Sequence, residues 1–128
     1  MPENKAFVWN ELNTRDVKKA KDFYGKLLGW TFEEMPMGPG QTYTIIKLDG
    51  EQIGGIFKME GPMFEGIPEN WFTYIAVDDV DKMMKKVKDA GGKVIREPFD
   101  VPMAGRIAIV ADSNGAVSGW MVPAPQPS

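Results

Sequence analysis

The chain has 128 residues, of which 43% are hydrophobic and 26% charged, and its formal net charge is −3. It contains no cysteine and no histidine, which excludes disulfides, thiolate nucleophiles and imidazole chemistry. The charges are mixed in sign, and apolar runs reach only about five residues, so neither a nucleic acid nor a membrane is expected as a partner. We expect a cytoplasmic protein with a single domain over residues 1–122 and a proline-rich tail over residues 123–128.

The first half of the chain predicts one helix among four strands. Asp16 offers a capping carboxylate to a helix that begins at Val17, and Gly29 follows the last apolar position as a stop. Asp49 and Gly50 form a typical hairpin turn. Alternating or β-branched segments predict strands over residues 6–12, 30–32, 42–48 and 53–59.

The second half predicts the same order of elements. Asp79 caps a helix whose apolar positions recur in steps of three and four, and Gly91 and Gly92 end it. A polar turn is expected over residues 112–115. The predicted strands cover residues 71–77, 93–97, 106–111 and 116–122.

A constant offset of 63 residues superposes the two halves. The matched pairs include Trp9 with Phe72, Asp16 with Asp79, and Gly29 with Gly92. Such a repeat predicts an α+β fold of two tandem βαβββ modules, over about residues 6–60 and 70–122. Two modules of this kind would form a curved mixed sheet around a cleft, which is a usual place for a ligand.

Several segments resemble the vicinal oxygen chelate superfamily, which includes glyoxalase I, bleomycin-resistance proteins, fosfomycin-resistance transferases and extradiol dioxygenases. The resemblance covers residues 6–122 and implies the paired βαβββ fold. It rests on Phe7-Val8-Trp9-Asn10-Glu11-Leu12, Asp22-Phe23-Tyr24, Leu27-Leu28-Gly29-Trp30 and the closing segment over residues 105–116.

In metalloenzymes of that superfamily, the resemblance places the metal ligands near four positions of this chain. These positions carry Trp9, Gly55 or Ile56, Phe72 and Gly119. None of these side chains offers the nitrogen or oxygen lone pair that divalent metals require. We therefore expect no metal and no cofactor.

The same positions predict an organic ligand site. Trp9 and Glu11 share one face of a strand because side chains alternate, and Phe72 and Tyr74 share another. Gly119 would leave the floor of the cleft open. Together with Arg106 on a neighbouring strand, these residues form the predicted ligand-binding set. Alternatively, Trp9 and Phe72 fill the vacated metal site as core.

Glu11 is the main catalytic candidate. Beside aromatic rings, its carboxylate could act as a general base, with Tyr74 as the acid or oxyanion donor. Glu11 could equally anchor a ligand, face solvent or pair with Arg106.

Methionines in predicted loops or at strand ends suggest adaptable surfaces. A mobile lid over residues 35–40 and 60–70 is one interpretation, and shielding of the sheet ends is the other. The methionines concerned are Met35, Met37, Met59, Met63 and Met103.

The function favoured by the sequence is metal-independent binding of a small apolar or aromatic molecule. The resemblance also implies a homodimer. One alternative is a metal-free isomerase or lyase with Glu11 as base. Others are a metalloenzyme whose ligands are not yet placed, and a structural or partner-binding module.

Overall fold

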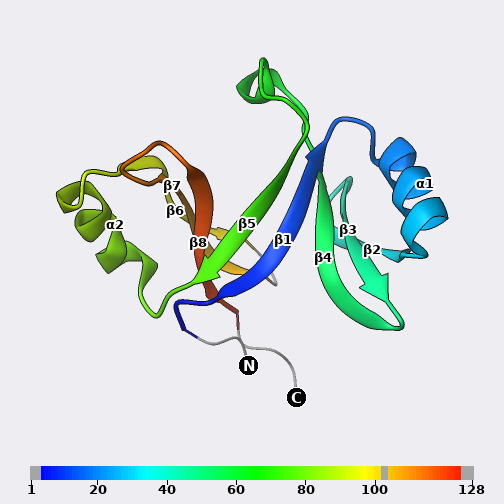
Figure 1. Ribbon diagram of the computed structural model, residues 1–128, viewed down its shortest axis with the longest axis horizontal. Helices are drawn as coiled ribbons and strands as arrows, with labels where there is room; N and C mark the ends of the chain where they lie inside the picture. Colours follow the sequence, from blue (N-terminus) through cyan, green and yellow to red (C-terminus); the bar gives the residue numbers. More distant parts are fainter. Residues whose placement is uncertain (1–3, 102–103, 125–128) are drawn as a thin grey trace. The chain divides into compact units, whose positions relative to one another are not determined.

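The computed structural model describes residues 4–101 and 104–124, and it divides into two compact units. The first unit is Trp9–Phe72, and the second joins Met1–Val8 to Thr73–Ser128. Each unit holds one α-helix beside four strands, and Figure 1 shows each helix beside the strands of its own unit. The α+β class and the repeated βαβββ order are thus confirmed.

The first unit orders its strands β2-β3-β4-β1. Strands β1 and β4 run parallel, with Glu11 opposite Gly55, and the other neighbours run antiparallel. This order lets the helix cross over one face of the sheet before the chain returns as three adjacent strands. The elements are β1 (Phe7–Thr14), α1 (Val17–Leu28), β2 (Thr31–Gly38), β3 (Gln41–Leu48) and β4 (Glu51–Lys58).

The second unit repeats this arrangement in the order β5-β8-β7-β6, with β5 and β8 parallel. Near its start, Ala76 exchanges backbone hydrogen bonds with Lys5 and Ala6. The elements are β5 (Asn70–Ala76), α2 (Val80–Asp89), β6 (Lys93–Val101), β7 (Gly105–Ala111) and β8 (Val117–Pro123).

The predicted caps and turns occur in the structure. Asp16 accepts a hydrogen bond from the backbone of Lys19 at 3.0 Å, and Asp79 accepts one from Lys82 at 3.1 Å. Both carboxylates therefore satisfy helix donors that would otherwise lack a partner. At the predicted hairpin, Asp49 and Gly50 take positive φ angles of 51° and 82°, as this two-residue turn requires.

Each helix covers one face of its own sheet. In the first unit, buried Leu12, Ile46 and Ile56 pack with half-buried side chains of α1, among them Val17 and Ala20. In the second unit, α2 contributes to a core formed by Val77, Val80, Met84, Val87, Ala108 and Val110.

The apolar stripe of α1 is buried less than its spacing predicts. Phe23, Leu27 and Leu28 are 56%, 63% and 52% exposed, and α1 has no fully buried residue. Periodicity alone does not distinguish these positions from Val17 and Ala20, because all of them lie on a broad apolar side of one helix.

Two strands, β2 and β6, extend several residues beyond their predicted ends. β2 continues through the expected loop over residues 35–40, where Met35 lies opposite Tyr43 and Pro36 opposite Thr42. Proline is tolerated there because β2 is the edge of its sheet. The predicted loop is therefore wrong for residues 35–38, whereas the lid stays a prediction. β6 extends to Val101 through two register shifts, and β8 extends into the predicted tail as far as Pro123.

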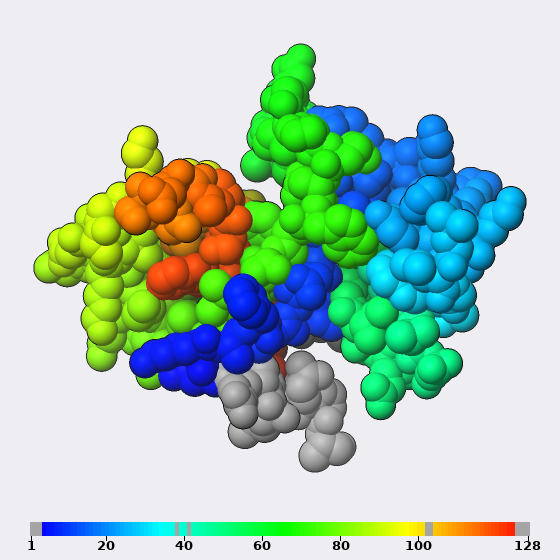
Figure 2. Space-filling view, viewed as in Figure 1, coloured from blue at the N-terminus to red at the C-terminus, as the bar shows by residue number. Residues whose placement is uncertain are grey.

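A linking segment, residues 59–69, connects β4 to β5 and contains a short 3-10 helix, Pro62–Phe64. Figure 2 shows this segment, in green, as a protrusion of the first unit. Met59 at its start is buried, Met63 is 66% exposed, and Met103 lies outside the described residues. Within the described ranges, no helix has the length and apolar character needed to cross a membrane. The cleft expected between the modules stays a prediction.

Candidate functional site

The first-unit sheet presents two chemically different faces. Leu12 and Ile56 lie opposite each other and belong to the core beneath α1. Glu11 and Gly55 form the next pair along the strands, and Ile45 lies opposite Gly55 on β3. Because side chains alternate, this row lies on the face away from α1. We call it the Glu11 face, defined by Trp9, Glu11, Tyr43, Ile45 and Gly55.

Three side chains on the Glu11 face form a hydrogen-bonded chain. The indole Nε1 of Trp9 donates to the Tyr43 hydroxyl at 3.0 Å. The Tyr43 hydroxyl in turn donates to Oε2 of Glu11 at 2.7 Å. Glu11 is only 9% exposed, whereas both rings are half-buried. Hydrogen bonds therefore link the indole, the phenol and the carboxylate in series, and we call this series the Trp9–Tyr43–Glu11 chain.

Gly55 makes this chain possible. β4 lies between β1 and β3, so the Tyr43 side chain must pass over β4 to reach Glu11. A Cβ atom at Gly55 would lie 1.9 Å from the Tyr43 hydroxyl oxygen and 2.3 Å from Cζ. No real side chain could occupy that position without moving the ring. The glycine therefore provides the space that the phenol occupies.

Sequence reasoning predicted Trp9 and Glu11 but missed Tyr43. The available signal was the residue spacing on β3, because Tyr43 and Ile45 share a face, together with the adjacent glycines Gly54 and Gly55. Recognising it requires the strand order, which places β3 two strands away from β1.

Two other predicted residues lie together in the second unit. Tyr74 is the parallel-strand neighbour of Gly119, and Ile75 is the neighbour of Trp120. Trp120 packs on the α2 core, so Tyr74 and Gly119 lie on the face away from α2. Phe72 is half-buried and, by alternation, shares its strand face with Tyr74.

Arg106 does not lie on the same sheet face as Tyr74 and Gly119. It shares its strand face with Ala108, which is part of the α2 core, and so lies on the opposite face from Gly119. Its guanidinium binds Asp81 through Nε at 2.8 Å and Nη2 at 3.0 Å, and Asp100 through Nη1 at 3.1 Å. This bidentate contact holds the pKa of Asp81 below its usual value. The predicted role of Arg106 in ligand binding is corrected to surface ion pairing.

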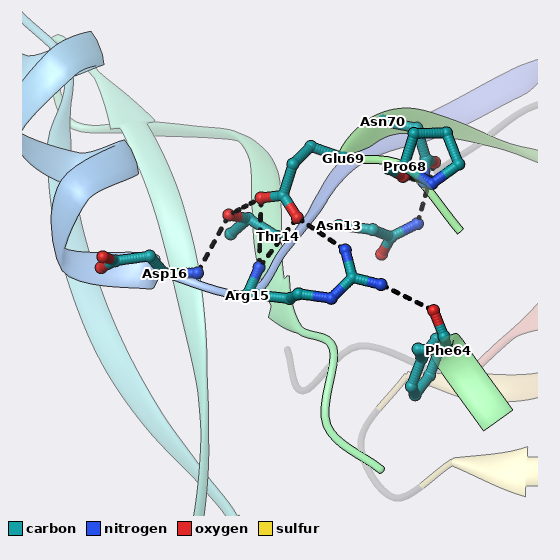
Figure 3. A network of polar contacts seen from close by, with 8 residues as sticks. All are labelled: Asn13, Thr14, Arg15, Asp16, Phe64, Pro68, Glu69 and Asn70. Carbon is teal, nitrogen blue, oxygen red and sulfur yellow. Dashed lines mark hydrogen bonds and ion pairs between the residues drawn. The ribbon is translucent and has the colours of Figure 1, made fainter. Parts of the chain in front are cut away.

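A polar network fixes the linking segment to the end of β1 (Figure 3). The Glu69 carboxylate accepts a hydrogen bond from the Thr14 hydroxyl. It also accepts from the backbone N–H of Arg15, whose nitrogen lies 3.1 Å from Oε1 and 3.3 Å from Oε2. Arg15 also donates to Glu69 through Nη1 at 3.0 Å and to the carbonyl of Phe64 through Nη2 at 2.6 Å. The Thr14 hydroxyl, and then Arg15, lower the pKa of Glu69, while partial desolvation opposes them.

Two surface hollows lie elsewhere. One, of about 550 Å³, runs beside the linking segment, and its lining cations are already paired, Arg15 with Glu69 and Lys58 with Glu60. The other, of about 190 Å³, lies at the end of α2 and is lined by residues that include Val87 and Trp120. Neither is lined by Trp9, Glu11 or Tyr43, and neither presents a convergent set of polar groups for a ligand.

A metal fits the Glu11 face poorly. The resemblance places one ligand at Gly55 or Ile56; any side chain at Gly55 would collide with Tyr43, and Ile56 is part of the core beneath α1. The indole of Trp9 has a donor and no lone pair for a cation. Glu11 and Tyr43 do carry oxygen, but these atoms are hydrogen-bonded to each other at 2.7 Å. Among the described residues, no three acidic side chains gather into a metal-binding group.

Comparison with known proteins identifies the family. The sequence profile of the Glyoxalase/Bleomycin resistance protein/Dioxygenase superfamily matches residues 6–117. "Putative glyoxylase CFP32" of Mycobacterium bovis is 41% identical over 124 residues, which cover 97% of this chain and 46% of CFP32. "Anthracycline biosynthesis protein DnrV" of Streptomyces peucetius is 35% identical over 122 residues, covering 87% of this chain and 44% of DnrV. The chain thus spans a little under half the length of these curated relatives.

Solved structures share the fold at low sequence identity. Hypothetical protein BH1468 from Bacillus halodurans has a TM-score of 0.72 at 16% identity, covering 95% of this chain and 96% of its own. Methylmalonyl-CoA epimerase from Mycobacterium tuberculosis has a TM-score of 0.65 at 17% identity, covering 98% of this chain and 93% of its own. The profile match over most of the chain and the curated relatives establish the assignment: this chain belongs to the glyoxalase/bleomycin resistance protein/dioxygenase superfamily.

Proposed function

We propose that this protein binds a small aromatic molecule on the Glu11 face without a metal. The observation that carries the proposal is the Trp9–Tyr43–Glu11 chain, which sets two half-buried rings beside a buried carboxylate. Aromatic walls with a few fixed polar groups are the usual chemistry of an organic-ligand site. Phe72, Tyr74 and Gly119 remain predicted contributors.

Rigidity of the polar groups supports a binding role. Each hydrogen bond of the chain restricts the side chain that makes it, so the rings need little further ordering when a ligand arrives. The relative DnrV adds support of a different kind. Its name refers to anthracycline biosynthesis, and anthracyclines are fused-ring aromatic compounds, the class that stacks on indole and phenol rings.

A second candidate is a metal-free isomerase or lyase in which Glu11 is the base. The hydrogen bond of 2.7 Å from the Tyr43 hydroxyl to Glu11 gives this enzymatic role only partial support. A hydroxyl could relay a proton, but the proton of Tyr43 is already donated to this carboxylate. We therefore assign Glu11 as an anchor in the first instance. The Glu11→Gln variant distinguishes the roles, because a base requires a catalysed reaction that the variant abolishes.

The test is calorimetric titration of the protein with phenol, naphthol and anthrol, which carry one, two and three rings. We expect saturable binding that strengthens with ring number. Trp9→Leu should weaken it about two- to tenfold, since a stacked ring contributes about 0.5–1.5 kcal/mol beyond its buried area. Trp71→Leu is the matched control, because Trp71 lies in the aromatic cluster of Tyr24 and Trp30 at α1.

Two outcomes would refute the proposal. One is the absence of saturable binding of all three probes up to about 1 mM, the weak limit of useful affinity. The other is binding that Trp9→Leu and Trp71→Leu reduce equally. The homodimer and the cytoplasmic location predicted from the sequence remain part of the proposal, and light scattering of the purified protein tests the former.

A further inference from the structure

One side of α1 carries exposed apolar side chains beside an ordered aromatic cluster. Phe23 and Leu27 lie one turn apart on this helix and are 56% and 63% exposed, and Trp71 is 45% exposed. The centroid of the Tyr24 ring lies 5.0 Å from that of Phe23 and 5.6 Å from that of Trp71. The indole of Trp71 also donates to the Tyr24 hydroxyl at 3.2 Å. We call this surface the α1 patch, defined by Phe23, Leu27 and Trp71.

The internal repeat indicates that a module of this fold does not need these apolar residues for its own core. At the offset of 63 residues, Phe23 corresponds to Lys86 and Leu27 to Ala90, and both of these are exposed. α2 nevertheless has fully buried residues on its sheet side, whereas α1 has none. Phe23 and Leu27 therefore add apolar surface beyond what covers the sheet. A contiguous exposed patch of this kind is typical of a contact site for another molecule.

Positive charge borders the α1 patch. Lys19 and Lys26 lie four residues before and three residues after Phe23, which makes them its neighbours on the helix surface. Both lysines are exposed, and neither forms an ion pair with another described residue. The carboxylate of Asp16 is engaged in capping the helix. The other lysines of α1 are in ion pairs: Lys18 with Asp22 at 3.0 Å, and Lys21 with Glu34 at 3.6 Å.

The size and charge of the α1 patch favour a small acidic partner over a second copy of this chain. Aromatic side chains present about 150–250 Å² each, so the exposed fractions leave roughly 300 Å² of apolar surface. Because interfaces are a little over half apolar, this patch fits an interface of roughly 500–600 Å² per partner, below the roughly 800 Å² of a stable complex. Two copies docked through the same patch would also set lysines against lysines.

We propose that the α1 patch binds an acidic amphipathic helix of a partner protein. Apolar side chains at positions i, i+3, i+4 and i+7 of that helix pack along Phe23 and Leu27 and against Trp71. Its carboxylates meet Lys19 and Lys26. Tyr24 already holds the aromatic rings, so binding requires little further ordering of side chains. This inference is independent of the proposed function, because no residue of the α1 patch belongs to the Glu11 face.

The test selects a helix from a displayed peptide library against the full chain. Each peptide is about four turns long and has leucine at positions i, i+3, i+4 and i+7, with alanine, glutamine, glutamate or lysine elsewhere. We expect the enriched peptides to contain more glutamate than lysine. Fluorescence anisotropy then gives the dissociation constant of the most enriched peptide for the wild type and its variants.

Leu27→Ala should weaken binding of that peptide about five- to fiftyfold, because most of an apolar anchor is removed. Alanine is the residue that the repeat carries at the corresponding position, Ala90. Leu28→Ala is the matched control and should leave the affinity unchanged. Leu28 is 52% exposed but lies about 140° around α1 from Phe23, on the side of Lys21.

A variant with both Lys19→Gln and Lys26→Gln tests the charge of the α1 patch. It should weaken binding and remove most of its salt dependence, because rim charges act through screened attraction. Both side chains are exposed, so this variant also covers the case in which Leu27→Ala does not fold. Unchanged affinity and salt dependence would overturn the acidic character of the partner.

Other outcomes would overturn the inference as a whole. Enrichment of no peptide, or of lysine-rich peptides, is one, and equal losses in Leu27→Ala and Leu28→Ala are another. A dimer that sedimentation detects in the wild type and that Leu27→Ala dissociates would assign the patch to a second copy. Binding to phosphatidylglycerol vesicles that Leu27→Ala abolishes would assign it to a lipid surface.

Discussion

The hydroxyl of Tyr43 lies 2.7 Å from Oε2 of Glu11, although the two residues come from strands separated by β4. The contact passes over Gly55, the only residue type that leaves room for the phenol at that position. Tyr43 thereby holds both the carboxylate and, through its oxygen, the indole of Trp9.

Removing the Tyr43 hydroxyl should cost more than removing that of Tyr24. Both phenols accept a hydrogen bond from an indole, Tyr43 from Trp9 at 3.0 Å and Tyr24 from Trp71 at 3.2 Å. Tyr43 additionally donates to a buried carboxylate, and hydrogen bonds to charged groups are the stronger class. We expect Tyr43→Phe to lower the free energy of unfolding by about 1.5–3 kcal/mol and Tyr24→Phe by about 0.5–1.5 kcal/mol. Urea unfolding of the two variants measures the difference, and equal losses would contradict the assignment.

Adding one methyl group at Gly55 should disrupt the same contact. The new Cβ would require the Tyr43 ring to move, with a cost of about 1–3 kcal/mol for overpacking. In a Tyr43→Ala background, Gly55→Ala should cost much less, because the conflicting ring is absent. A double-mutant cycle in urea measures this coupling. Additive effects of the two substitutions would show that the ring and the glycine do not interact.

Local patterns in the sequence encode the helix caps and the hairpin turn. Capping by Asp16 and Asp79 and the turn at Asp49 depend on neighbours within a few residues, so the sequence alone predicts them. The constant offset between the halves then gives the module order, because each half repeats the same local signals.

Local patterns do not give the order of strands in the sheet, and they do not say which face of the sheet a strand residue lies on. Features that depend on either were therefore not predictable from the sequence. Tyr43 meets Glu11 only because β3, β4 and β1 are neighbours in that order. Arg106 was placed with Gly119 because their strands adjoin, but its side chain lies on the α2 side of the sheet. The prediction of a loop at Met35 was wrong because Pro36 lies in an edge strand, where proline is tolerated.

Acid should weaken the attachment of the linking segment. The pKa of Glu69 is lowered from the usual 4.5, mainly by the Thr14 hydroxyl and then by Arg15. A lowered folded-state pKa means that the stabilisation is fully present above the unfolded value and is lost as pH falls through the folded value. Unfolding midpoints measured from about pH 6 down to about pH 2 should therefore fall less steeply in Glu69→Gln than in the wild type. Glu65→Gln in the same segment serves as control and should follow the wild type, whereas identical slopes for all three proteins would exclude this role of Glu69.

Arg106 should be dispensable for ligand binding. Its ion pairs with Asp81 and Asp100 lie on the exposed α2 side of the sheet. We expect Arg106→Gln to leave the dissociation constant for naphthol unchanged and to raise the pKa of Asp81 toward its usual value of 3.8, because the guanidinium that lowers it is removed. Carboxyl titration followed by NMR measures the pKa. A large loss of naphthol affinity would restore Arg106 to the site.

The central claim is that the Glu11 face holds an aromatic ligand without help from a metal ion. The most direct measurement is titration of naphthol into protein dialysed against a strong chelator, repeated after addition of nickel, zinc, manganese or ferrous ions. The account predicts the same dissociation constant in every case, because Trp9, Tyr43 and Glu11 supply the contacts themselves. Affinity that disappears with the chelator and returns with one stoichiometric metal would contradict it.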